Sequence, residues 1–155
     1  MEEQWNTICY LASLFESNSI EYQFDASTSV FIHGIDFIMD DIDVIVLKEY
    51  KDKVSQLFLE YEQTDIKVYN NSLEYFFIQM QGQKIHIMFP YGKKDCVEET
   101  TDIVHNGIKI HTKTIEFYYR HIKNDNPLLP LIDKKLKEGS GLDSAVRPEG
   151  GRYFT

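Results

Sequence analysis

Two aspartates separated by one residue are the chemically most distinctive feature of this sequence. Asp41 and Asp43 flank Ile42 and introduce the apolar run of residues 43–47, which reads DVIVL. If this run is a strand, residues two apart point to the same side, so both carboxylates aim at one point. Two converging carboxylates repel each other unless one is protonated or a cation lies between them. Because Mg²⁺ prefers hard oxygen ligands, the spacing predicts a divalent metal site at Asp41 and Asp43.

A hydroxyl-rich turn precedes this pair by about a dozen residues. Ser27 is predicted to be the N-cap of a short helix over residues 27–34, and Gly34 is a suitable end for it. Ser27, Thr28 and the free N–H groups at the start of that helix would together hold a phosphate. A metal beside a phosphate cradle is the arrangement needed for phosphoryl or nucleotidyl transfer. Acidic residues are also common where loops meet strands, so spacing alone leaves an ordinary surface junction as the alternative.

Hydrophobic periodicity predicts the elements that must position these residues. The predicted helices cover residues 3–17, 27–34 and 49–61, with two more in the C-terminal part marked by apolar residues over 115–122 and 128–136. The predicted strands cover residues 20–25, 43–47, 65–69, 73–80, 84–89 and 107–112. This order predicts a single α/β domain of the α+β type over residues 1–137, with a mixed, mostly antiparallel sheet flanked by helices. The glycine-containing segment 138–155 has no apolar period and is predicted to be a flexible tail.

The order of elements, together with the stretch FDASTSVFIHGIDFIMDDIDVIV (residues 24–46), resembles the nucleotidyltransferase superfamily, which has the polymerase-beta-like fold. The likeness is to the small bacterial nucleotidyltransferase-like domains and covers roughly residues 5–137. It implies that Ser27 matches the phosphate-binding serine, and that Asp41 and Asp43 match the metal-binding pair. It also implies Mg²⁺ or Mn²⁺ as cofactor and a nucleoside triphosphate as substrate.

Two positions depart from the pattern of that superfamily. The glycine that precedes the phosphate-binding serine is Ala26 here, and a Cβ at this place obstructs close approach of the backbone to phosphate. The third carboxylate, which acts as general base and often as a metal ligand, is matched by His86 in the run KIHIMF. Histidine is able to act as a base near neutral pH, but it suits Mn²⁺ or Zn²⁺ better than Mg²⁺. His86 is therefore a candidate catalytic residue with Asp41 and Asp43, and a core or strand-surface histidine is the alternative.

The net charge, the cysteine content and the absence of long apolar runs limit the kinds of partner and compartment that we expect for this protein. The formal net charge is −9, so broad nucleic-acid binding is not expected. The two cysteines, Cys9 and Cys96, form no CxxC motif, and no apolar run of 18 residues is present, so we expect a cytoplasmic protein without a membrane span. Two functions follow. One is transfer of a nucleoside monophosphate from a nucleoside triphosphate to an unknown hydroxyl. The other is a non-catalytic module that binds a nucleotide or a protein partner, as antitoxin-like members do.

Overall fold

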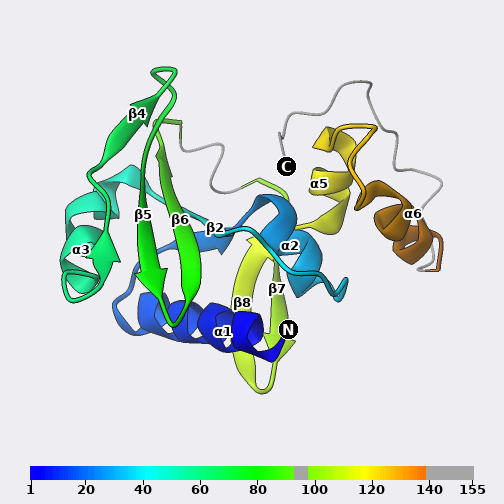
Figure 1. Ribbon diagram of the computed structural model, residues 1–155, viewed down its shortest axis with the longest axis horizontal. Helices are drawn as coiled ribbons and strands as arrows, with labels where there is room; N and C mark the ends of the chain where they lie inside the picture. Colours follow the sequence, from blue (N-terminus) through cyan, green and yellow to red (C-terminus); the bar gives the residue numbers. More distant parts are fainter. Residues whose placement is uncertain (93–97, 139–155) are drawn as a thin grey trace.

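The computed structural model describes residues 1–92 and 98–138, and its centre is one mixed sheet of eight strands (Figure 1). The strand order is β3-β5-β6-β2-β1-β8-β7, with β4 paired to the free edge of β5. Only two neighbouring pairs are parallel, β2 with β6 and β1 with β8, and the other pairs are antiparallel. The predicted fold class, a mixed and mostly antiparallel sheet flanked by helices, is confirmed.

The elements follow one another closely along the chain. The helices are α1 (Glu2–Ser17), α2 (Ala26–Ile32), the 3₁₀ turn η1 (Lys48–Tyr50), α3 (Lys51–Leu57), α5 (Ile115–His121) and α6 (Leu129–Glu138). The strands are β1 (Tyr22–Phe24), β2 (Ile42–Val46), β3 (Glu62–Gln63), β4 (Lys67–Tyr69), β5 (Leu73–Met80), β6 (Gln83–Pro90), β7 (Thr100–His105) and β8 (Ile108–Lys113).

The main core lies between α1 and one face of the sheet. Leu11 and Phe15, on the apolar stripe of α1, are fully buried with Val44 of β2 and Ile87 of β6. All five residues of β2, including Asp43, are buried, as expected for a central strand that is covered on both faces. The opposite face of β2 carries Asp43, so one strand supplies both the core and a polar centre.

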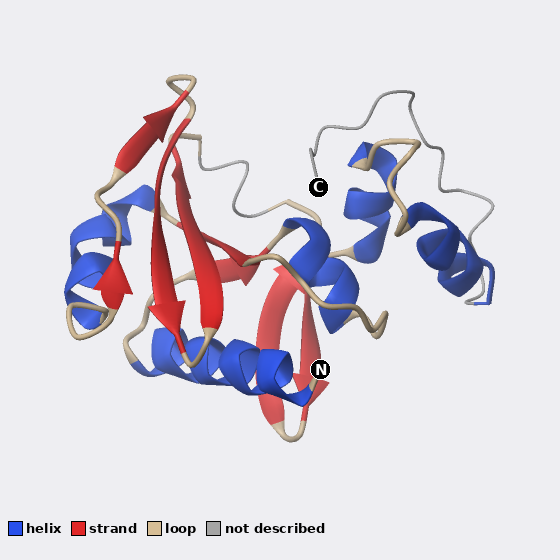
Figure 2. Cartoon of the chain, viewed as in Figure 1, coloured by secondary structure: helices blue, strands red, loops and turns tan. Residues whose placement is uncertain are grey.

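A second, smaller core joins the C-terminal helices to α2. Val30, Tyr118 and Ile132, from α2, α5 and α6, are all fully buried in it. Figure 2 shows α5 and α6 grouped beside α2, at the end of the molecule away from α3. This second core fixes α2 from its outer side, while the sheet fixes it from the inner side.

The structure differs from the predicted elements in several places. Residues 100–105 form β7, an edge strand that periodicity did not predict, and the helix predicted over 49–61 is only α3 preceded by η1. Leu131, expected on the apolar face of the last helix, is 46% exposed. Cys96 and the tail from residue 139 onward lie outside the described residues. Among the residues that are described, no helix is long and apolar enough to cross a membrane.

Candidate metal centre

Asp43 and His86 face each other across two parallel strands at the centre of the sheet. The register of β2 and β6 pairs Asp43 with His86, so both side chains leave the same face of the sheet. His86 Nδ1 lies 3.1 Å from Asp43 Oδ1. Asp41 lies one residue before β2, and its carboxylate completes a group whose ligand atoms are all within 4.8 Å of one another. The structure therefore brings together the three residues that the sequence singled out.

The backbone of Asp43 is held by the start of α2. The amide of Asp43 donates a 2.8 Å hydrogen bond to Thr28 Oγ1, and the amide of Asp25 donates one of 3.1 Å to the carbonyl of Asp43. Thr28 is fully buried, and Asp25 and Asp43 are nearly so. A buried amide without a partner is costly. These bonds therefore fix the backbone position of Asp43, and with it the place from which its carboxylate extends.

Burial makes this position unfavourable for an isolated negative charge. The pKa of Asp43 is raised to about 7, chiefly by burial; the hydrogen bond and charge of His86 lower it, and the neighbouring charges of Asp41 and Asp25 raise it. A carboxyl that is buried beside two other acids is stabilised in its ionised form by a cation. The electrostatics of the site thus favour a positive charge between these residues.

The donor atoms also suit a divalent metal ion. Two ligands at right angles, each about 2.1 Å from a metal, are separated by about 3.0 Å, and the contact between Asp43 and His86 is 3.1 Å. With a proton on Nδ1 instead, the same contact is a hydrogen bond from His86 to Asp43. Two carboxylates and one imidazole are a mixed oxygen and nitrogen set, which suits Mn²⁺ better than Mg²⁺.

Aromatic side chains fix the ring of His86. It stacks on Phe77 with ring centroids 4.5 Å apart, and Tyr75 meets it edge-on at 5.2 Å. Its Nε2 atom is buried, and among the described residues nothing hydrogen-bonds to it. The ring therefore presents only Nδ1 to the acidic pair.

A cavity of about 530 Å³ is lined by residues of α1, β1, β2, β7 and β8, and Asp41, Asp43 and His86 are not among them. It is lined by Ile45, two residues after Asp43 on β2, and by His111 of β8 with Asp102 of β7. A separation of two residues along a strand is about 7 Å, and Ile45 is the cavity-lining residue that is nearest to Asp43 along β2. His111 Nδ1 lies 2.7 Å from Asp102 Oδ1, so the cavity wall is polar on the side away from β2.

The structure changes the interpretation of the hydroxyl-rich turn. The N-cap of α2 is Asp25 and not Ser27, because the helix begins one residue before the predicted start. Ser27 is half-exposed in the first turn, whereas the hydroxyl of Thr28 points to β2. Ala26 has a φ of +52°, a left-handed conformation that glycine adopts without strain. The departure from glycine at this position therefore has a conformational cost as well as a steric one.

Asp25 is a buried acidic residue beside Asp43 that the sequence analysis did not single out. It is the last residue of the predicted strand over 20–25, directly before the hydroxyl-rich turn. An acidic residue between a strand and a hydroxyl-rich turn was an available signal. That Asp25 lies next to Asp43 follows from the antiparallel pairing of β1 and β2, and no local sequence pattern predicts this pairing.

Comparison with solved structures gives three informative similarities. TM1012 of Thermotoga maritima, a candidate nucleotidyltransferase, is similar at a TM-score of 0.65 and 15% identity over 89% of this chain and 90% of its own. The lincosamide antibiotic adenylyltransferase LnuA, in its lincomycin-bound form, is similar at a TM-score of 0.60 and 14% identity over 94% of this chain and 98% of its own. An antigenic nucleotidyltransferase-like protein from Paracoccidioides brasiliensis is similar at a TM-score of 0.57 and 13% identity over 86% of this chain and 73% of its own.

The comparisons by sequence are negative. The chain matches no protein-family model and no curated protein sequence. At identities of 13–15% the structural likeness establishes the architecture. From the sheet order, the position of the acidic pair and these similarities together, the chain has a nucleotidyltransferase-like fold.

Proposed function

We propose that this protein is a metal-dependent nucleotidyltransferase that moves a nucleoside monophosphate from a nucleoside triphosphate to a hydroxyl group. The observation that carries the proposal is the convergence of Asp41, Asp43 and His86 within 4.8 Å on one face of the sheet. The nucleotidyltransferase-like fold supports it, since LnuA is named as an adenylyltransferase.

In this proposal Asp41, Asp43 and His86 hold a divalent ion, Mg²⁺ or Mn²⁺. When bound, such an ion neutralises charge on the phosphates and favours ionisation of the attacking hydroxyl. Ser27, half-exposed in the first turn of α2, contacts the triphosphate through its hydroxyl. Thr28 acts indirectly, by holding the amide of Asp43.

The reaction forms a bond between the acceptor oxygen and the α-phosphorus and breaks the bond from that phosphorus to the bridging oxygen, so pyrophosphate leaves. The acceptor also loses its hydroxyl proton. The carboxylate oxygen of Asp43 that does not bind the ion takes that proton, because a carboxylate positioned beside the reacting hydroxyl can act as a general base.

The test is release of pyrophosphate together with transfer of label from α-³²P nucleoside triphosphates onto a panel of hydroxyl compounds. Parent protein should transfer label with Mn²⁺, and Asp43→Asn should lose at least about 100-fold of this rate, since it loses both charge and proton acceptor. Equal rates in the two proteins, or no label transfer by the parent to any acceptor, would count against the proposal. Stable binding to a protein partner without nucleotide binding would favour the non-catalytic alternative.

A further inference from the structure

We propose that Lys84 binds the β- and γ-phosphates of the nucleoside triphosphate at the candidate metal centre. This inference rests on the proposed function, because the phosphates belong to the same substrate. It gives the site a positive charge that comes from the protein itself, in addition to the charge of the metal ion.

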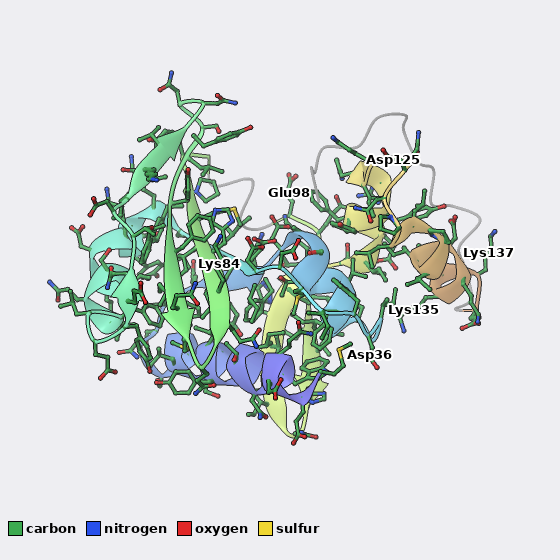
Figure 3. All side chains as sticks on the ribbon, viewed as in Figure 1. Asp36, Lys84, Glu98, Asp125, Lys135 and Lys137 are labelled. Carbon is green, nitrogen blue, oxygen red and sulfur yellow. The ribbon has the colours of Figure 1, made fainter. Side chains whose placement is uncertain are left out.

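Lys84 lies on β6, two residues before His86 (Figure 3). Side chains two residues apart on a strand leave the same face of the sheet, about 7 Å from each other. In the register of β2 and β6, His86 pairs with Asp43 and Ile85 pairs with Ile42, and Lys84 is the next residue back along β6. Lys84 is therefore one strand step from the metal centre, on the face from which the side chains of Asp43 and His86 extend.

The ammonium group of Lys84 lies over the ring of Phe77, which also stacks on His86. Its Nζ is 4.2 Å from the centroid of the Phe77 ring, and the centroids of Phe77 and His86 are 4.5 Å apart. Lys84 is exposed, and within the described part of the chain its ammonium forms no ion pair and no hydrogen bond. The ring thus holds the ammonium in place without neutralising its charge. Because the contact is weak at an exposed site and the lysine stem is flexible, the ammonium is free to turn to a phosphate beside it.

The charges of the site favour a cation at this position. A divalent ion neutralises only part of the charge of a triphosphate, and Asp41 and Asp43 add further negative charge. In β1, β2, β5 and β6, all of which the structure describes completely, the basic residues are Lys84 and His86. The helix α2 carries no charged residue. Since His86 presents Nδ1 to the acidic pair, Lys84 is the cation that these elements offer to a phosphate.

The position of Lys84 also indicates which phosphates it meets. In the proposed reaction the α-phosphorus lies next to the ion, where the acceptor oxygen attacks it. Lys84 is one strand step further along β6, so the phosphates beyond the α-phosphate are the ones within its reach. These two phosphates leave as pyrophosphate, and a lysine binds such a group as a compact point charge.

The experiment measures the binding of ATP, AMP and inorganic pyrophosphate to the full chain by calorimetry in the presence of Mn²⁺, and the binding of Mn²⁺ alone. Lys84→Met is the test variant, because methionine keeps an unbranched apolar stem against Phe77 and removes the charge. Lys84→Arg keeps the charge. Lys137→Met makes the same change at an exposed lysine on α6, away from β6 (Figure 3), and is the matched control.

We expect Lys84→Met to weaken the binding of ATP and of pyrophosphate at least about tenfold, because each loses a charge-assisted contact. The affinities for AMP and for Mn²⁺ should change little, since AMP lacks the β- and γ-phosphates. Lys84→Arg should retain most of the ATP affinity. A structural role of Lys84, acting through Phe77 on His86, would instead lower the affinities for Mn²⁺ and AMP as much as that for ATP, and would overturn the inference.

The outcome for Asp43→Asn separates this inference from the proposed function. If Lys84→Met binds ATP as tightly as the parent and Lys137→Met do, while Asp43→Asn loses ATP, the inference fails and the proposed function stands. If every variant binds ATP like the parent, or if the parent itself binds no ATP with Mn²⁺, both fail.

Discussion

The hydroxyl of Thr28 accepts a 2.8 Å hydrogen bond from the amide of Asp43, and Thr28 is fully buried. This bond joins the first turn of α2 to the strand that carries the acidic pair. Thr28 therefore holds the backbone of Asp43 in the candidate metal centre, whereas the sequence suggested that Thr28 contacts a phosphate. Because the bond is to the backbone, it sets the position of Asp43 without using its carboxylate.

Thr28→Val should therefore affect both stability and metal binding. Valine has the shape of threonine but leaves the buried amide of Asp43 without an acceptor, which costs about 1–3 kcal/mol in the free energy of unfolding. Metal affinity should fall as well, because the strand is no longer held in place. Urea unfolding and Mn²⁺ titration measure the two effects. Thr28→Ser keeps the hydroxyl and should retain most of the metal affinity; equal metal binding in the valine and serine variants would show that the bond does not position Asp43.

His86→Asp should convert the mixed ligand set into one made of oxygen alone. Mg²⁺ affinity should rise on the order of tenfold, while Mn²⁺ affinity changes less, because the harder ion gains more from an added carboxylate. Calorimetric titration with each ion gives the two affinities. His121→Asp adds the same charge on α5 and is the control. A fall in Mg²⁺ affinity in His86→Asp would show that the histidine is a required ligand.

The raised pKa of Asp43 predicts a pH dependence of stability in metal-free buffer. Between the ordinary aspartate pKa of 3.8 and the folded value of about 7, the folded protein retains a proton that the unfolded chain has lost. Stability must then fall as the pH rises through this window, by up to about 1.4 kcal/mol per pH unit from this group. Asp43→Asn lacks the group, so it should gain stability relative to the parent by up to about 4 kcal/mol as the pH rises from 4 to 7.

Denaturant unfolding of both proteins in EDTA at several pH values measures this difference. It should grow steadily across the window and then level off. A difference that stays constant from pH 4 to pH 8 would mean that Asp43 is ionised at all these values in the folded protein. Adding Mn²⁺ at pH 7 should stabilise the parent and not the variant, because only the parent has the buried carboxylate that the ion neutralises.

Ala26→Gly should have little effect on the free energy of unfolding, although a change from alanine to glycine inside an ordinary helix is destabilising. The φ of +52° strains alanine by about 1 kcal/mol, and glycine relieves this while adding a similar entropy cost to folding. The free energy of unfolding should therefore change by less than about 1 kcal/mol. Nucleotide affinity should rise, because the backbone beside Ser27 becomes more accessible. Val30→Gly, within the same helix, is the contrasting control and should destabilise strongly; similar losses in both variants would contradict this account of the turn.

The strands at the centre of the sheet could be predicted from the sequence, because each is marked by residues that are adjacent in the chain. The run from Ile42 to Val46 is apolar except for Asp43, and β5 and β6 lie on either side of a turn in which Gln81 and Gly82 both have positive φ. The edge strand β7 was missed because half of it faces solvent, with Val104 at 68% exposure, so its alternation is weak. A stronger signal was the Asn106-Gly107 turn, where both residues also have positive φ.

The sequence allowed prediction of only those residues of the candidate site whose type and spacing indicate a chemical role. Asp41 and Asp43 are distinctive by type and spacing. His86 was predicted because its run KIHIMF resembles the strand that carries the third carboxylate in the superfamily, and in the structure it pairs with Asp43. The positions of Thr28 and Asp25 relative to Asp43 depend on which strands pair and on how α2 docks against β2. Those relations link residues about 15 or more positions apart and are fixed by packing, so local sequence does not contain them.

The most direct test of the account is a calorimetric titration of ATP in the presence of Mn²⁺ into the parent protein, Asp43→Asn and the control Asp36→Asn. Asp43 is buried beside Asp41 and His86, whereas Asp36 is exposed on a loop. The account predicts metal-dependent binding to the parent and the control, and a loss of at least about tenfold in affinity in Asp43→Asn. Equal affinity in all three proteins, or binding that persists unchanged in EDTA, would contradict the claim that this acidic centre holds a metal and a nucleotide.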